Sequence, residues 1–217
     1  MTGREAWPLD GEGVWRELAA AGGAPRPALF LDRDGVIVAE VDHLCRPEDV
    51  ELMAGATALI AAANRAGAAV VVVTNQSGIG RGLYGWAEFD AVQREIARRL
   101  AAANARWDAV MASPFHPEGR APWRHPDHPA RKPNPGMLTA AAEALGLDLA
   151  SSWILGDRAS DTAAGRRAGL EGGLFVGPGY YPGEAAEALA QRSDGYAVAR
   201  IATPAEAPRH LPFLAPA

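Results

Sequence analysis

Short, almost uninterrupted apolar segments alternate along the chain with longer segments in which apolar residues recur every three or four positions. Segments of the first kind are typical of strands buried on both faces of a parallel sheet, and segments of the second kind are typical of helices covering it. The strand-like segments are 28–32 (ALFLD), 68–74 (AAVVVVT), 107–113 (WDAVMAS), 152–157 (SWILGD) and 173–177 (GLFVG). Their alternation with helices predicts an α/β fold with a mainly parallel sheet.

Four helices are expected between these strands, over residues 56–67, 86–104, 134–146 and 160–169. The third has Asn134 as its predicted N-cap, Pro135 in its first turn and Gly146 at its end. Residues 113–131 are rich in Pro and His and are predicted to form a long loop. Residues 1–26 include the Ala/Gly-rich AAAGGAP, so we expect an N-terminal arm followed by one domain over residues 27–217.

Size and composition limit the classes of protein to consider. With 217 residues, 48% of them hydrophobic, the chain is long enough for one well-filled core. A formal net charge of −5 disfavours a nucleic-acid partner, and the single cysteine, Cys45, excludes a multi-thiolate zinc site within the chain. The N-terminus lacks a signal pattern, and the apolar segments are too short to span a bilayer, so we expect a cytoplasmic protein.

Polar residues collect where the predicted strands end, which is where parallel sheets bind ligands. They are Asp32 and Asp34 after the first strand, Thr74 and Asn75 after the second, and Asp157 after the fourth. A second group, Arg131 and Lys132, directly precedes a helix. Converging carboxylates beside basic residues are costly to bury unless a cation and an anionic ligand complete the cluster. The pattern therefore predicts a Mg²⁺ site that faces a phosphate group.

Four sequence motifs, in this order, resemble those of the haloacid dehalogenase (HAD) superfamily of phosphatases. They are DRDGV at 32–36, Thr74 within VVVVTNQSGIGRG, Lys132 within RKPNPGM, and GDRASD at 156–161. The residues of the second and third motifs are most similar to those of the branch that contains heptose bisphosphate and histidinol-phosphate phosphatases. The resemblance covers about residues 27–178. It implies a three-layer α/β/α sandwich with a Rossmann-like sheet.

The resemblance also implies a role for each motif residue. Asp32 is expected to be the nucleophile that forms an aspartyl phosphate, and Asp34 the general acid and then the general base. Thr74 and Lys132 are expected to hold the phosphate oxygens, with Asn75 as a further donor nearby.

The same resemblance implies a Mg²⁺ ion held by Asp32, Asp157 and the backbone carbonyl of Asp34. Asp161 is expected to orient water or Lys132, although its position at a helix start makes capping an equal alternative. Arg81 is interpreted as a substrate contact, with a solvated loop charge as the alternative.

The loop before Lys132 departs from the pattern of this branch, whose members commonly hold zinc there with three cysteines and a histidine. In this chain Ser113 and Ala130 stand where thiolates are expected, so no structural zinc is expected. Three histidines, His116, His125 and His128, could form a different site, but we interpret them as part of a Pro-rich surface loop.

The intervals between the motifs are too short for a separate cap domain, so the phosphate site is expected to be open. The predicted substrate is a small phosphorylated sugar, in first place a heptose 1,7-bisphosphate whose second anionic group is held by Arg131 and Arg81. Alternatives are histidinol phosphate or another small phosphomonoester, a polynucleotide 3′-phosphate, and a phosphosugar-binding protein without catalysis.

Overall fold

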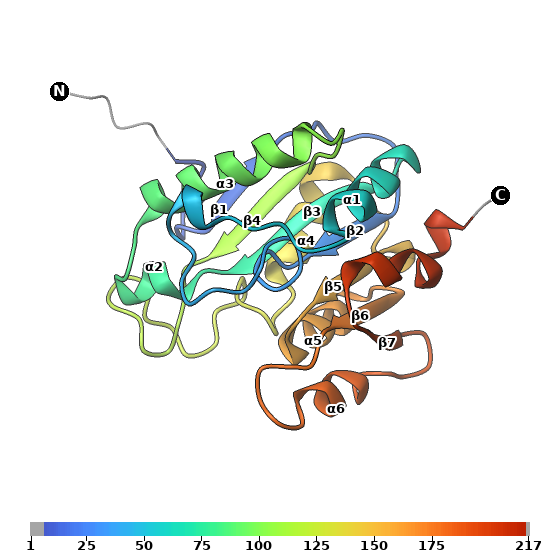
Figure 1. The fold of residues 1–217 in the computed structure, drawn as a ribbon. Coiled ribbons are helices and arrows are strands. Elements are labelled where there is room, and N and C mark those ends of the chain that lie inside the picture. Colours follow the sequence, from blue (N-terminus) through green and yellow to red (C-terminus); the bar gives the residue numbers. More distant parts are fainter. Residues whose placement is uncertain (1–6, 216–217) are drawn as a thin grey trace.

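The computed structural model describes residues 7–215 and contains one seven-stranded sheet with the strand order β1-β4-β3-β2-β5-β6-β7 (Figure 1). All neighbouring strands are parallel except β1, which pairs antiparallel with β4. The strands are β1 (Trp15–Leu18), β2 (Ala28–Leu31), β3 (Ala69–Asn75), β4 (Ala109–Ser113), β5 (Trp153–Gly156), β6 (Gly172–Val176) and β7 (Ala197–Ile201). The predicted α/β fold with a mainly parallel sheet is confirmed.

Helices cover both faces of this sheet, which gives the predicted three layers. The helices are α1 (Ala56–Arg65), α2 (Ser77–Arg81), α3 (Trp86–Ala101), α4 (Gly136–Leu145), α5 (Ala159–Ala168) and α6 (Glu184–Leu189), with 3₁₀ turns at Pro47–Asp49, Leu149–Ser151, Pro204–His210 and Pro212–Leu214. Side chains from α1 and α3 pack on one face, and side chains from α4 and α5 pack on the other. Successive residues of β2 enter the two cores in turn, because neighbouring side chains in a strand point to opposite faces.

Strand β2 lies between β3 and β5, and this position assembles the motifs. Leu31 pairs with Val72 on one side and with Leu155 on the other, so Asp32 follows directly between the ends of the two neighbouring strands. The chain leaves β2 toward β3 and later returns to its other side at β5, which makes this edge a topological switch point. Three motifs far apart in sequence therefore meet at one place.

The expected N-terminal arm contributes a strand to the sheet. Residues 15–18 form β1, and Trp15 is buried against Trp86 and Phe89, with ring centroids 5.5 and 5.1 Å away. The strand has only four residues, and two of them, Arg16 and Glu17, are charged, so it is too short and too polar to recognise in sequence. Residues 1–6 of the arm lie outside the described residues.

The predicted N-cap of α4 is wrong by one position. The helix begins at Gly136 with Pro135 as its N-cap, and no side chain caps it. The Asn134 amide instead donates to the Asp127 carboxylate and to the His128 carbonyl, so it fastens the 113–131 loop to the start of α4. Across residues 7–215, no helix combines the length and hydrophobicity needed to cross a bilayer.

Candidate active site

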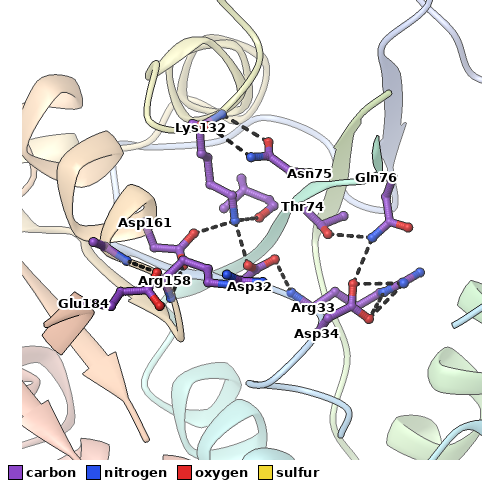
Figure 2. Close-up of polar contacts among 12 residues, drawn as sticks. Asp32, Arg33, Asp34, Thr74, Asn75, Gln76, Lys132, Arg158, Asp161 and Glu184 are labelled. Carbon is purple, nitrogen blue, oxygen red and sulfur yellow. Dashed lines mark hydrogen bonds and ion pairs between the residues drawn. The ribbon is translucent and has the colours of Figure 1, made fainter. Parts of the chain in front are cut away.

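A cavity of about 810 Å³ opens at the carboxyl edge of the sheet, where the predicted site residues meet. Figure 2 shows the polar contacts among several of them, including Asp32, Thr74 and Lys132. Asp161 lies behind the cavity wall and is fully buried. The predicted residues that line the cavity are Asp32, Asp34, Thr74, Asn75, Arg81, Arg131, Lys132 and Asp157. The structure thus brings together residues from five separate segments of the chain.

Lys132 is a buried cation at the centre of this arrangement, with only 2% of its surface exposed. Its ammonium group lies 3.0 Å from an Asp32 oxygen and 2.5 Å from an Asp161 oxygen, and it donates to the Val73 carbonyl at 2.7 Å. Burial lowers the pKa of Lys132, but the two carboxylates outweigh burial and the net shift is upward. Lys132 is therefore charged and is oriented toward the carboxyl end of β2.

The Asp161 carboxylate contacts both the start of α5 and Lys132. One carboxylate oxygen accepts a hydrogen bond from the backbone N–H of Arg158 at 3.0 Å, which caps α5. The other oxygen forms the ion pair with Lys132. A single side chain thus fixes the start of α5 and the position of the lysine ammonium.

Three carboxylates converge beside Lys132. Oxygen atoms of Asp32, Asp157 and Asp161 lie within 4.8 Å of one another. Burial, opposed by Lys132 and reinforced by the neighbouring acids, raises the pKa of Asp32 to about 6, and burial with the Asp32 charge raises that of Asp157 to about 8. A small divalent cation with oxygen ligands relieves such repulsion, and the donor set fits Mg²⁺.

Gly35 is required for the close approach of the first and last motifs. Its φ is +74°, and a Cβ at this position would lie 2.1 Å from Oδ2 of Asp157. Any larger residue would push the Asp157 carboxylate away from Asp32, so the glycine of DRDGV has a steric role in shaping the candidate cation site.

We expect Mg²⁺ to stabilise the protein more strongly as the pH rises from about 5 to about 8. The pKa values of Asp32 and Asp157 lie above the ordinary 3.8. Between about pH 5 and pH 8 the metal-free folded chain therefore binds more protons than the unfolded chain does. Its free energy of unfolding falls as the pH rises through this range. Thermal unfolding with EDTA and with saturating Mg²⁺ measures the difference. If Mg²⁺ raises the unfolding temperature equally at about pH 5 and about pH 8, the assignment of Asp32 and Asp157 as Mg²⁺ ligands is contradicted. It is also contradicted if Mg²⁺ stabilises Asp157→Asn as much as the parent.

Asn75 lies against the backbone of Lys132 (Figure 2). Its amide donates to the Lys132 carbonyl at 3.0 Å and its oxygen accepts from the Lys132 N–H at 3.1 Å. This reciprocal pair joins the end of β3 to the lysine loop. Arg131 also has a structural contact, donating to the Phe115 carbonyl at 2.8 Å, while Arg81 lines the cavity from the end of α2.

The three loop histidines each accept a backbone N–H at Nδ1, from the residue two positions later. The imidazole of His128 stacks on Phe115 with ring centroids 3.5 Å apart, and His125 meets it edge-on at 5.1 Å. Among the described residues, the histidines are not part of any group of three potential ligands that comes together as the three aspartates do. Aromatic packing and turn hydrogen bonds hold this loop.

Several residues of the cavity had no role in the sequence analysis. Glu40 lines it, and burial beside the Asp34 charge raises the pKa of this carboxyl to about 7. The Arg158 guanidinium stacks on the Tyr180 ring at 3.5 Å. Arg158 stands inside the GDRASD motif, so its position was available from sequence, whereas Glu40 and Tyr180 lie in loops whose paths only the fold reveals.

Comparisons with known proteins agree with this geometry. A family model for HAD-hydrolase-like proteins matches residues 129–203. The chain is 47% identical over 171 residues to a D-glycero-β-D-manno-heptose-1,7-bisphosphate 7-phosphatase of Mesorhizobium japonicum, which covers 78% of this chain and 79% of that protein.

Two crystal structures are similar over most of the chain. A HAD-like protein from Mesorhizobium loti superimposes with a TM-score of 0.85, at 40% identity and 96% coverage of both chains. A D,D-heptose 1,7-bisphosphate phosphatase from B. bronchiseptica, complexed with magnesium and phosphate, gives a TM-score of 0.70 at 30% identity, covering 85% of this chain and 97% of that one.

Proposed function

The chain belongs to the HAD superfamily of phosphatases, and we propose that it removes the 7-phosphate from a D-glycero-D-manno-heptose 1,7-bisphosphate in a Mg²⁺-dependent reaction. The observation that carries the chemistry is the Asp32 carboxylate, held 3.0 Å from the Lys132 ammonium beside Asp157 in an open cavity. The 47% identity to the phosphatase named for this heptose supports the substrate.

In the proposed reaction an Asp32 oxygen attacks phosphorus and forms an aspartyl phosphate, while the bond from phosphorus to the sugar oxygen breaks. Asp34 gives its proton to the departing sugar oxygen. It then takes a proton from a water molecule, whose oxygen attacks phosphorus and releases inorganic phosphate and Asp32. Bound Mg²⁺ supplies neutralisation of the anionic charge between carboxylate and phosphate.

Lys132 and Thr74 are proposed to hold the oxygens of the phosphate being transferred. Asn75 supports this site through the Lys132 backbone, because its amide already forms a reciprocal pair there. Asp32, Asp157 and the Asp34 carbonyl are the proposed Mg²⁺ ligands, while Asp161 holds Lys132. We propose that the 113–131 loop needs no structural zinc, since stacking of Phe115 on His128 packs its base.

The cavity suits a doubly anionic sugar. Arg81 and Arg131 line it beside the phosphate site, and Arg158 lines the side formed by α5. A guanidinium group can hold a second phosphate in a forked hydrogen-bonding geometry. A cavity of about 810 Å³ accommodates one heptose bisphosphate, and nucleic acid remains disfavoured by the net charge of −5.

The proposal is tested by Mg²⁺-dependent phosphate release from a set of substrates. The set contains both anomers of heptose 1,7-bisphosphate, histidinol phosphate, common sugar phosphates and a 3′-phosphorylated oligonucleotide. We expect the highest kcat/KM for a heptose bisphosphate. A tenfold preference for histidinol phosphate or the oligonucleotide, about 1.4 kcal/mol, would overturn the substrate but not the phosphatase activity.

A further inference from the structure

The Asp34 carboxylate is held by four hydrogen-bond contacts, all of them from donors (Figure 2). The buried Arg33 guanidinium supplies three, from Nε to Oδ1 at 3.0 Å and from Nη2 to both oxygens at 2.9 Å. The fourth comes from Nε2 of Gln76, which donates to Oδ2 at 2.9 Å. This carboxylate is therefore fixed in direction by side chains that nothing in the proposed reaction has yet used.

Tyr84 helps to set the direction in which the Gln76 amide points. Its hydroxyl donates to Oε1 of Gln76 at 2.5 Å, so the amide nitrogen faces the opposite way. That nitrogen then donates both to Asp34 and to the Thr74 hydroxyl oxygen at 2.8 Å. Because Thr74 accepts from Gln76, its own hydrogen is free to be donated to a phosphate oxygen.

The Tyr84 ring is held firmly enough to perform this role. A Cβ on Gly78 would lie 2.2 Å from a ring carbon, so the ring packs directly on the backbone of α2. Arg33 is anchored from α3 in a similar way. Its Nη1 reaches Oε1 of Gln93 at 3.5 Å, and its guanidinium lies 5.5 Å from the centre of the Phe89 ring.

We propose that Arg33 and Tyr84 are positioning residues for proton transfer, with Arg33 acting on Asp34 directly and Tyr84 acting through Gln76. This inference rests on the proposed function, in which Asp34 is the general acid and base. Without the Tyr84 hydroxyl, Oε1 of Gln76 loses its donor, so the amide is held less firmly in the orientation that donates to Asp34. Displacement of an acid–base group by about 1 Å can lower the rate by up to about 10²-fold.

The test compares two phosphate esters in the Tyr84→Phe variant. An alkyl phosphate, the best substrate of the set described above, needs a proton on its leaving oxygen, whereas p-nitrophenyl phosphate does not. For Tyr84→Phe we expect kcat/KM to fall about tenfold with the alkyl phosphate and to change less than about twofold with p-nitrophenyl phosphate. With p-nitrophenyl phosphate kcat should also fall and a burst of nitrophenol appear, because hydrolysis of the aspartyl phosphate still needs Asp34 as base.

Two variants serve as references. Asp34→Asn should also lower kcat/KM more for the alkyl phosphate than for p-nitrophenyl phosphate, and by a larger factor than Tyr84→Phe. Tyr196→Phe removes another buried phenol contact, a 2.7 Å bond to the Thr162 carbonyl away from the cavity, and should change both esters alike. If Asp34→Asn lowers kcat/KM equally for both esters, the general-acid assignment fails, and the proposed function fails with it in this respect.

If Asp34→Asn lowers kcat/KM more for the alkyl phosphate than for p-nitrophenyl phosphate while Tyr84→Phe lowers both equally, the positioning role of Tyr84 alone is overturned. Arg33→Lys provides an independent measurement, since lysine keeps the charge but cannot form the forked contact with both Asp34 oxygens. In Arg33→Lys, kcat/KM for the alkyl phosphate should fall relative to that for p-nitrophenyl phosphate by at least as large a factor as in Tyr84→Phe. A loss that is equal for both esters in Arg33→Lys would overturn the positioning role of Arg33.

Discussion

Asp32→Asn is expected to lower phosphatase activity by about 10⁴-fold or more, because a carboxamide cannot replace the carboxylate as nucleophile. The fold should be kept. Asparagine has nearly the same shape, and Asp32 lies among acids that repel it, since oxygens of Asp32, Asp157 and Asp161 lie within 4.8 Å of one another. Lys132 retains Asp161 as its ionic partner in the variant.

Phosphate release from the preferred sugar phosphate measures this effect, and thermal unfolding checks the fold. Asp148→Asn is a matched control, because Asp148 caps a 3₁₀ turn directly before β5, at the amino edge of the sheet. It should leave turnover within about twofold of the parent, as surface changes away from the site usually do. Turnover by Asp32→Asn within about tenfold of the parent would remove Asp32 from the nucleophile position.

The location of the site could be predicted from sequence because the strand pattern is strong. Strand β3 is seven residues long and six of them are buried, so its end at Asn75 is well defined in sequence. Once β2, β3 and β5 are expected to be parallel, their carboxyl ends must meet. Asp32, Thr74 and Asp157 follow from that alone, and the structure places all three in one cavity.

The contacts that orient those residues could not be predicted in the same way. Tyr84 stands in the turn between α2 and α3, and its hydroxyl reaches Gln76 only because Gly78 leaves room for the ring. The reciprocal pairing of the Asn75 amide with the backbone of a loop 57 residues later was likewise not available from the sequence. Such details depend on loop paths, which hydrophobic periodicity does not encode.

Lys132→Met is expected to destabilise the protein by about 3–5 kcal/mol and to abolish turnover. Lys132 is the cation between two buried carboxylates, and methionine fills a similar volume without charge. Asp32 and Asp161 would then face each other uncompensated in an interior that keeps only 8% of the surface of Asp32 exposed. Denaturant unfolding with EDTA measures the loss, so that a metal ion does not mask it.

The adjacent Arg131→Met is the matched control, because Arg131 donates to the Phe115 carbonyl and forms no ion pair among the described residues. It should cost about 1 kcal/mol or less. Adding Asp161→Asn to Lys132→Met should restore part of the lost stability, since one uncompensated charge disappears, without restoring turnover.

The deficit of Lys132→Met should also shrink as the pH falls from about 8 toward about 6. The pKa of Asp32 is already raised to about 6 in the parent, where Lys132 opposes the shift, and it must rise further once that cation is lost. Protonation at low pH then removes the uncompensated charge in the folded state, so the variant approaches the parent in stability. A deficit that stays constant from about pH 5 to pH 8 would mean that Lys132 stabilises the fold by packing, and that the Asp32–Lys132–Asp161 arrangement is not held by charge.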